Sequence, residues 1–282
     1  MQSLKENIHI EDKYAGVTLG AINLPHGRIY IDAPMLPEDA RSWRADLLGF
    51  ESGTEHLLVH LDTNIDRIIG ARAMDARSLA HESLAEYFNN RSTTFKTQND
   101  PTGAEWENMP MMLSNIRWAP PEITFTEKTT LYWGETPLIF EHHPGADIGA
   151  IWLILPEEKI VFVGDTITKN QPPFFANANL SHWLEDLNLL ASEKYRGYTI
   201  VSGRGGVCAS STLEKQRQYI LYAHKKLTAL LARNAEFAET EHLIPELLSP
   251  LRFLVSDEKD YAQRLRHGLK EYYLRNLLLK EE

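Results

Sequence analysis

The chain has 282 residues, of which 43% are hydrophobic, and a formal net charge of −10 at pH 7. This length can bury one large core, and the acidic balance opposes binding to nucleic acid or anionic lipid, since both need a clustered positive field. The single cysteine, Cys208, excludes an internal disulfide framework. The first residues lack an apolar signal segment, and the longest apolar run, 148–155, is too short to cross a bilayer. We therefore expect a cytoplasmic protein without nucleic-acid or membrane partners.

The first third of the chain predicts strands that end in a polar loop. Residues 14–24 and 28–31 are rich in β-formers and flank the turn sequence Pro25-His26-Gly27, which predicts a hairpin. The apolar run Leu57-Leu58-Val59 predicts a buried strand, and the polar stretch from His60 to Gly70 follows it. Such a stretch at a strand end is typical of an active-site loop, and Gly70 permits a close turn before the next element.

The middle of the chain lacks periodicity and then becomes β-rich. Residues 91–121 contain tryptophan and methionine but no regular pattern, which favours a lid or insertion over a cleft. From residue 123 the sequence predicts short strands up to His142, a loop at 143–149, an apolar strand at 150–155, and a strand at 160–163 that ends in Gly164-Asp165-Thr166.

The last third is mainly helical. Residues 181–192 and 212–234 predict amphipathic helices on either side of a strand at 199–202, which ends in Gly203-Arg204-Gly205. Residues 233–282 predict two further helices, divided near Ser249-Pro250. Amphipathicity alone leaves two roles open for this extension: an oligomer contact, or packing on the chain's own core.

The loop from His60 to Gly70 resembles the H-x-H-x-D-H-x-x-G metal-binding loop of the metallo-β-lactamase superfamily, aligned through Asp66 and Gly70. Residues 143–166 resemble the loop, hairpin and G-D strand end of that family's second half, and Ile31-Asp32-Ala33-Pro34 loosely resembles its I-D-[TS]-G strand end. The resemblance implies an α/β fold, an αββα sandwich over residues 1–232, with a helical C-terminal extension over 233–282.

The family's metal-ligand positions can be transferred one by one along this resemblance. They fall on Asp62, Asn64, Asp66, Arg67, Ala146, Asp165 and Arg204. The first metal would use Asp62, Asn64 and Ala146, and every imidazole of that triad is absent. The second would use Asp66, Arg67 and Arg204, with Asp165 shared between the metals, and both of its histidines are replaced by arginine.

Arginine is permanently protonated and has no lone pair to donate to a metal, but it can replace the metal's positive charge. We therefore predict that Arg67 and Arg204 form charge-assisted hydrogen bonds with Asp66 and Asp165, with Asp62 as a further candidate partner. We also predict that no zinc or other cofactor is bound and that zinc-dependent hydrolysis is absent. A binding, regulatory or unrelated activity would remain. One alternative is a hydrolase with a single Mg, Mn or Ca ion held by the oxygen ligands Asp62, Asn64, Asp66 and Asp165. Another is that an arginine faces the cleft and binds a small anionic ligand.

No replacement catalytic residue can be assigned. No serine lies in a G-x-S-x-G elbow, and Cys208 lacks a recognisable partner. Two readings stay open for His60: it approaches the cleft, or it is satisfied by backbone partners near the strand end. For His142 and His143 the readings are a local shift toward the site or exposure at the end of a hairpin.

Overall fold

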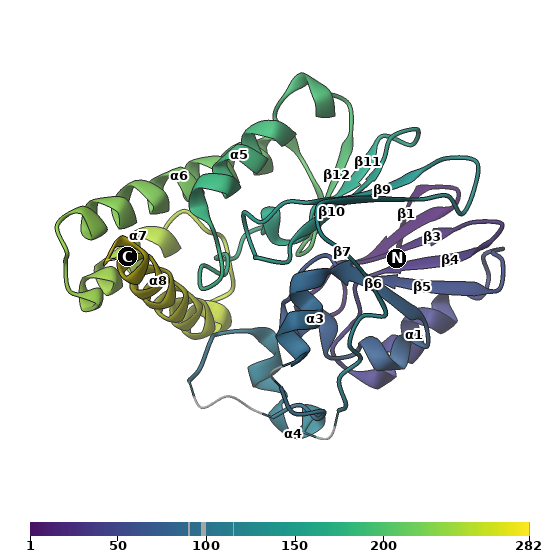
Figure 1. The fold of residues 1–282 in the computed structure, drawn as a ribbon, viewed down its shortest axis with the longest axis horizontal. Coiled ribbons are helices and arrows are strands. Elements are labelled where there is room, and N and C mark those ends of the chain that lie inside the picture. The colour runs from purple at the N-terminus through teal and green to yellow at the C-terminus, as the bar shows by residue number, and fades with distance from the viewer. Residues whose placement is uncertain (90, 97–99, 115, 282) are drawn as a thin grey trace.

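The computed structural model describes residues 1–89, 91–96, 100–114 and 116–281. Two sheets face each other, and helices cover the outer side of each, so that the layers follow the order helix, sheet, sheet, helix (Figure 1). The αββα sandwich predicted from the sequence is confirmed.

The first sheet has its seven strands in sequence order, β1 to β7. The pairs from β1 to β4 are antiparallel, and those from β4 to β7 are parallel. Its strands are β1 (Gln2–Lys5), β2 (Ile8–Glu11), β3 (Leu19–Asn23), β4 (Gly27–Ile31), β5 (Glu55–Val59), β6 (Arg77–His81) and β7 (Ile123–Phe125). The sequence analysis predicted the β3–β4 hairpin but missed β1 and β2, whose short alternating runs end in the charged stretch before residue 14.

The second sheet has the order β13-β12-β11-β10-β9-β8. Only β11 and β12 are parallel, because α5 connects them across the outer face of the sheet. Its strands are β8 (Lys128–Leu131), β9 (Leu138–His142), β10 (Ile151–Leu155), β11 (Ile160–Phe162), β12 (Thr199–Ser202) and β13 (Gly206–Cys208).

Apolar side chains alternate between the two faces of each sheet and define three layers of core. One cluster fills the space between the sheets, where Ile31 and Val59 of the first sheet share a core with Phe140 and Phe162 of the second. A second cluster lies between the first sheet and the helix that carries Trp43. A third covers the outer face of the second sheet. The period of two along the strands thus buries both faces of each sheet.

The helices are of two kinds. The α-helices are α1 (Pro37–Asp46), α2 (Ile65–Ile68), α3 (Glu82–Asn89), α4 (Pro110–Leu113), α5 (Leu180–Leu190), α6 (Ser210–Ala232), α7 (Ile244–Leu248) and α8 (Glu258–Glu281). Short 3₁₀ segments are η1 (Ala71–Met74), η2 (Glu105–Asn108), η3 (Gly164–Thr166), η4 (Glu193–Tyr195), η5 (Phe237–Leu243) and η6 (Val255–Asp257). No helix in the described ranges combines the length and apolar character that crossing a membrane requires.

The C-terminal helices pack on the body of the protein. Leu265, Leu269 and Tyr273 of α8 are fully buried in the same apolar cluster as the inner faces of α5 and α6. Figure 1 shows α8 lying beneath α6 and α7. Packing of this extension on the chain's own core, one of the two predicted roles, is therefore present.

The segment 91–121 lies beside the loop that follows β5. Residues 97–99 and 115 of this segment fall outside the described residues. The remainder includes η2 and α4, and it buries Phe95, Trp106 and Trp118 in one aromatic cluster with α3. Packing of three large aromatic rings holds this part of the segment against the domain. That the segment opens and closes as a lid stays a prediction.

Candidate functional site

Four strand ends meet at one edge of the sandwich. Asp32 follows β4, the loop 60–70 follows β5, η3 with Asp165 follows β11, and Arg204 follows β12. The members of each pair, β4 with β5 and β11 with β12, run parallel, so their carboxyl ends lie on the same side. This edge is where the sequence analysis placed the ligand positions.

Arg67 is completely buried and joins the two sheets. Its Nη1 donates to Asp62 Oδ2 over 2.5 Å, and its Nη2 pairs with Asp165 Oδ1. The chain makes room for this guanidinium by using glycine opposite it, because a β-carbon at Gly203 would lie 2.6 Å from Arg67 Nη1. The predicted pairing of Arg67 with Asp165 and Asp62 is confirmed, whereas Asp66 pairs with Arg204.

Arg204 forms the second half of the network. Its Nε donates to both carboxylate oxygens of Asp165, at 3.2 and 3.1 Å, and its Nη1 lies 3.0 Å from Asp66 Oδ2. The other Asp66 oxygen accepts the backbone N–H of Trp106 over 2.9 Å. Asp165 is therefore shared between the two guanidiniums, and the segment 91–121 contacts the network through Trp106.

Asp32 is a member of the site that the sequence analysis noted only as part of a loose motif. Its side chain is fully buried, its Oδ1 accepts the backbone N–H of Leu61 over 2.9 Å, and its Oδ2 lies 3.6 Å from Arg67 Nη1. Its φ of 57° is unusual for a residue other than glycine. The signal for Asp32 in the sequence was its place directly after the predicted strand 28–31, in the Ile31-Asp32-Ala33-Pro34 motif.

The network contains more negative than positive groups. Four buried carboxylates, Asp32, Asp62, Asp66 and Asp165, form ion pairs within 4.0 Å with two guanidiniums among the described residues, those of Arg67 and Arg204. The buried guanidinium of Arg264 lies farther away and attracts Asp165 and Asp66 more weakly. Burial and the neighbouring carboxylates raise the pKa of Asp62 to about 8, and burial raises the pKa of Asp32 to about 6. Both arginines hold the pKa of Asp165 below its ordinary value, against the effect of its burial.

Two guanidiniums therefore do not keep every carboxylate of the network ionised. Asp32 adds a fourth acid, and the carboxylates are buried, so the network retains protons near neutral pH. The Oδ2 atom of Asp32 has no hydrogen-bond partner in the described part of the chain, so it can carry a proton without losing a hydrogen bond.

A cleft of about 350 Å³ opens above the network. Asn64, Ala146 and Asp165 line its floor, together with Asp147. Asn64 donates to Asp165 Oδ2 over 2.9 Å, and Thr63 fixes Asp147 through its hydroxyl and backbone N–H. All seven transferred positions therefore lie in the network or in the wall of this cleft.

The walls of the cleft come from segments far apart in sequence. Arg91, Ala104 and Trp106 belong to the segment 91–121, and His267 and Arg275 lie on α8. The C-terminal extension thus has a second role that its amphipathic pattern did not reveal: it completes the cleft.

The donor set at this edge does not fit a zinc pair. None of the seven transferred positions carries an imidazole or a thiolate, and guanidinium groups stand between the carboxylates. Among the described residues, no three His, Cys, Asp or Glu side chains are placed to hold one metal ion.

The histidines near the loops do not line the cleft above the network. His60 is buried, and neither ring nitrogen has a hydrogen-bond partner in the described structure, so the backbone-satisfied reading is wrong; burial lowers its pKa to about 4. His143 is also buried rather than exposed: it stacks on Trp152 and pairs with Asp186 over 2.7 Å. His142 is half-buried and stacks on His81.

Cys208 does not supply a nucleophile. Its thiol lies 3.7 Å from the carbonyl oxygen of Gly206, and burial raises its pKa to about 11. The thiol is therefore protonated at neutral pH, and it does not line the cleft above the network.

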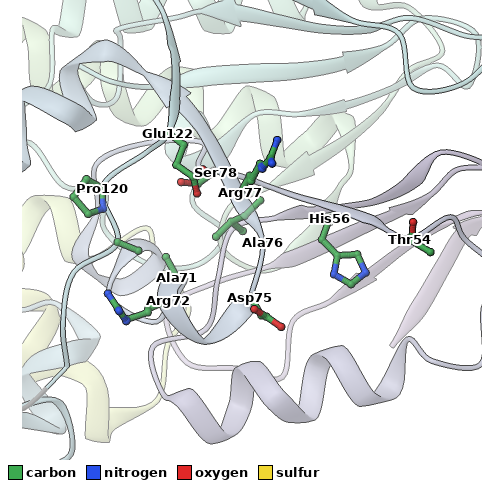
Figure 2. A pocket seen from close by; sticks show the side chains of 12 residues that line it. Thr54, His56, Ala71, Arg72, Asp75, Ala76, Arg77, Ser78, Pro120 and Glu122 are labelled. Carbon is green, nitrogen blue, oxygen red and sulfur yellow. The ribbon is translucent and has the colours of Figure 1, made fainter.

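A separate hollow of about 550 Å³ lies at the opposite ends of the strands (Figure 2). It is lined by residues such as Thr54, His56 and Arg77, which lie before or at the beginning of β5 and β6. Because the network follows the carboxyl ends of these strands, this hollow is not part of the candidate site.

The fold and the site define an αββα protein whose cleft lies at the strand ends between the two sheets. The sequence matches the family model of the metallo-beta-lactamase superfamily over residues 71–202. The match runs from η1 to the end of β12, so the loop carrying Asp62 to Arg67, and also Arg204, lie outside it. A search of curated proteins gives no match.

Solved structures share the fold at low sequence identity. A metallo-beta-lactamase from Pontibacter korlensis is 18% identical, with 76% of this chain and 94% of that chain covered and a TM-score of 0.57. The metallo-beta-lactamase IND-7 is 12% identical over 78% and 96% of the two chains, with a TM-score of 0.58. The sec-alkylsulfatase Pisa1 from Pseudomonas sp. is 12% identical, covers 97% of this chain and 49% of its own, and has a TM-score of 0.62.

The chain shares the metallo-beta-lactamase fold with these structures and matches that superfamily's model over slightly less than half of its length, residues 71–202. It spans about half of the alkylsulfatase chain, whereas it covers nearly all of the lactamase chains.

The network predicts a large stability loss on removal of Arg204. Arg204→Ala leaves Asp66 and part of Asp165 buried without a cation, which should lower the free energy of unfolding by about 3–5 kcal/mol in urea denaturation. Arg196→Ala, in an exposed ion pair with Glu193, is the control and should change it by less than about 0.5 kcal/mol. Unchanged stability in both Arg67→Ala and Arg204→Ala, with loss of stabilisation by anions, would instead assign the guanidiniums to a ligand.

The raised pKa of Asp62 predicts a pH dependence of stability. Between the ordinary value of 3.8 and about 8, the folded state holds a proton that the unfolded state releases, so the free energy of unfolding falls as pH rises through this window. Asp165, with a lowered pKa, loses its contribution only in acid and does not oppose this trend. Asp62→Asn mimics the protonated acid and should flatten the decline in melting temperature between about pH 6 and pH 8, above the pKa of about 6 of Asp32. Exposed Asp12→Asn should retain it, and an equal decline in Asp62→Asn would contradict the assignment.

Proposed function

We propose that this protein is a metal-independent binding member of the superfamily, in which paired arginines and aspartates take the place of the dinuclear metal site. In this proposal the cleft above the network receives a small anionic ligand, and no zinc-activated water is formed.

The observation that carries the proposal is that the carboxylate oxygens of the network already accept hydrogen bonds. Asp62 accepts from Arg67 and from the backbone N–H of Asn64, and both oxygens of Asp165 accept from guanidinium groups. These lone pairs would be the ones a metal needs. Since each guanidinium is buried and permanently charged, displacing it to admit a cation would leave an arginine without a partner in a buried site.

The residues of the network support binding rather than hydrolysis. Zinc hydrolases depend on a metal to lower the pKa of bound water toward about 7. Neither an aspartate that accepts arginine hydrogen bonds nor the guanidinium itself provides an equivalent acidification of water. What the network does provide is a rigid floor, because it ties the loop after β5 to the strand ends of the second sheet.

A single Mg, Mn or Ca ion is the competing proposal. Such ions take six or more oxygen ligands, and the carboxylates of Asp62, Asp66 and Asp165 would have to supply several of them. Arg67 and Arg204 contact all three carboxylates, so a divalent cation among them would meet two positive charges within a few ångströms. The arginines therefore favour the metal-free proposal.

The walls of the cleft favour an anion. Arg91 stacks on the ring of Tyr87 at 3.8 Å, and Arg275 donates to the carbonyl oxygen of Ala178. Among the described residues, neither guanidinium has a carboxylate within 4.0 Å, although both line the cleft. The carboxylate of Asp165, on the floor, is already neutralised by Arg67 and Arg204. Of the other acids that line the cleft, Asp147 accepts from Thr63 and Gly149, and Glu271 pairs with Lys270 over 3.9 Å. A carboxylate or sulfate group could therefore pair directly with Arg91 or Arg275.

Metal analysis tests the first half of the proposal. Elemental emission on protein purified without chelator should give substoichiometric zinc, and zinc titration by calorimetry should show no site at the strand ends. The variant Arg204→His should gain none, because Arg67, Asn64 and Ala146 still occupy the remaining ligand positions. One equivalent of zinc in the native protein, or hydrolysis of a lactam that a chelator stops, would refute the proposal.

Anion binding tests the second half. At constant ionic strength, sulfate at ten times its dissociation constant should stabilise the protein by about 1.4 kcal/mol. Arg91→Met and Arg275→Met should each reduce this gain, while Arg196→Met, away from the cleft, should preserve it. An equal gain in all three variants would show that sulfate acts elsewhere, and the cleft would lose its proposed ligand class.

A further inference from the structure

A second cavity, of about 710 Å³, lies next to the segment that pairs with Arg204 through Thr168. It is formed by residues 168–173, the first half of α6 and the segment 246–252 that includes the end of α7. The cavity shares no lining residue with the cleft above the network. Its size falls in the range of small-molecule sites, which is about 300–1,000 Å³.

The inner wall of this cavity is mainly apolar. Tyr219 and Leu247 are buried there, and Tyr222 and Leu251 are half-buried beside them. Pro173 and Pro250 complete the wall without offering a backbone N–H. A ligand that filled this space would need an apolar body, because most of its surface would be removed from water against aromatic and aliphatic groups.

The rim of the cavity is positively charged. Lys169, Lys215 and Arg252 are exposed at the rim, and no carboxylate of the described residues forms an ion pair with any of them. The two acidic residues of the rim already have partners.

Those partners lie on α6. Glu214 pairs with Arg217 over 3.0 Å, and Glu246 pairs with Lys226 over 3.3 Å. The uncompensated charge at the rim is therefore positive, in a chain whose net charge is −10. Such a local excess of cations complements an anionic head group.

Two buried polar groups in the wall lack partners. In the described structure, neither Gln216 Nε2 nor Tyr219 Oη forms a hydrogen bond, although the two side chains are only 6% and 8% exposed. Burial raises the pKa of Tyr219, so its hydroxyl keeps its proton. Both groups can therefore donate, and an unpaired buried donor is destabilising unless an acceptor reaches it.

We propose that this cavity is a ligand site for an organic carboxylate with an apolar body, of the class of medium-chain alkanoates. The alkyl chain lies against Tyr219, Leu247 and Leu251, and the carboxylate lies among Lys169, Lys215 and Arg252. Chain length then contributes through apolar burial, and the head group contributes through charge-assisted hydrogen bonds.

The site also contacts the network. Gln216 Oε1 accepts from the backbone N–H of Thr168 over 3.4 Å, and the backbone of Thr168 pairs with that of Arg204. A ligand that reorients the amide of Gln216 therefore acts on the segment that positions Arg204.

Calorimetry with octanoate, butyrate and octanol tests the proposal on the full chain. Octanoate should bind with one site per chain. Butyrate lacks four methylene groups and octanol lacks the charge, so each should bind at least about tenfold more weakly. The double variant Lys215→Met/Arg252→Met should lower octanoate affinity about tenfold, whereas Lys225→Met, on the same helix but outside the cavity, should not change it.

A filling variant locates the site. Leu251→Trp should abolish octanoate binding while a circular dichroism melt shows that the fold is retained. Gln216→Leu should not lower the melting temperature, because it removes an unpaired buried donor, and it should leave octanoate affinity within about threefold, because the head group lies at the rim. Absence of octanoate binding, its persistence in a folded Leu251→Trp variant, or its loss in Arg275→Met, which would place it in the cleft, would each overturn the proposal.

Discussion

The balance of charge in the buried network between the two sheets is the constraint on which the rest of the site depends. The guanidiniums of Arg67 and Arg204 and four carboxylates are almost completely buried there, and an unpaired buried charge would cost several kcal/mol. Arg67 contributes from the loop after β5 and Arg204 from the strand end of the second sheet. Because Asp165 binds both, the two halves of the sandwich are held at their common edge by side chains of the chain itself.

Burial, together with the presence of four carboxylates around two guanidiniums, explains why the pKa values within one cluster shift in opposite directions. Asp165 lies between both cations and is held ionised, whereas Asp62 and Asp32 share one cation and retain protons to higher pH. A metal pair would carry more positive charge than two arginines. Replacement by arginine therefore leaves a network that is closer to neutral when it is partly protonated.

Because the groups of the network bind one another, the surfaces around the network are the ones left to contact a ligand. The cleft above it owes its walls to the segment 91–121 and to α8, which also share in the apolar packing of the domain. The likeness in fold extends over 97% of this chain for the alkylsulfatase structure and over 76–78% for the lactamase structures. Both proposed ligand regions, the cleft and the cavity beside Thr168, involve the C-terminal extension.

The sequence by itself determined the strand succession, the placement of the site at the strand ends and the central chemical fact that no imidazole remains at the transferred positions. That fact follows from residue identity, because arginine lacks a lone pair in any fold. That Arg67 and Arg204 pair with aspartates was also predictable, since few other acids occur in the aligned loops. The first two strands were missed because their alternating runs are only four residues long.

Only the tertiary structure decided which acids share each cation and how many there are. Asp32 lies 35 residues before Arg67 in the chain and 133 before Asp165, and it meets them only because β4 and β5 are neighbours and the sheets stack. The closing of the cleft by α8 likewise depends on a contact between the chain's end and its middle. Protonation at the site follows from burial and from these long-range neighbours, and neither is a property of any local stretch of sequence.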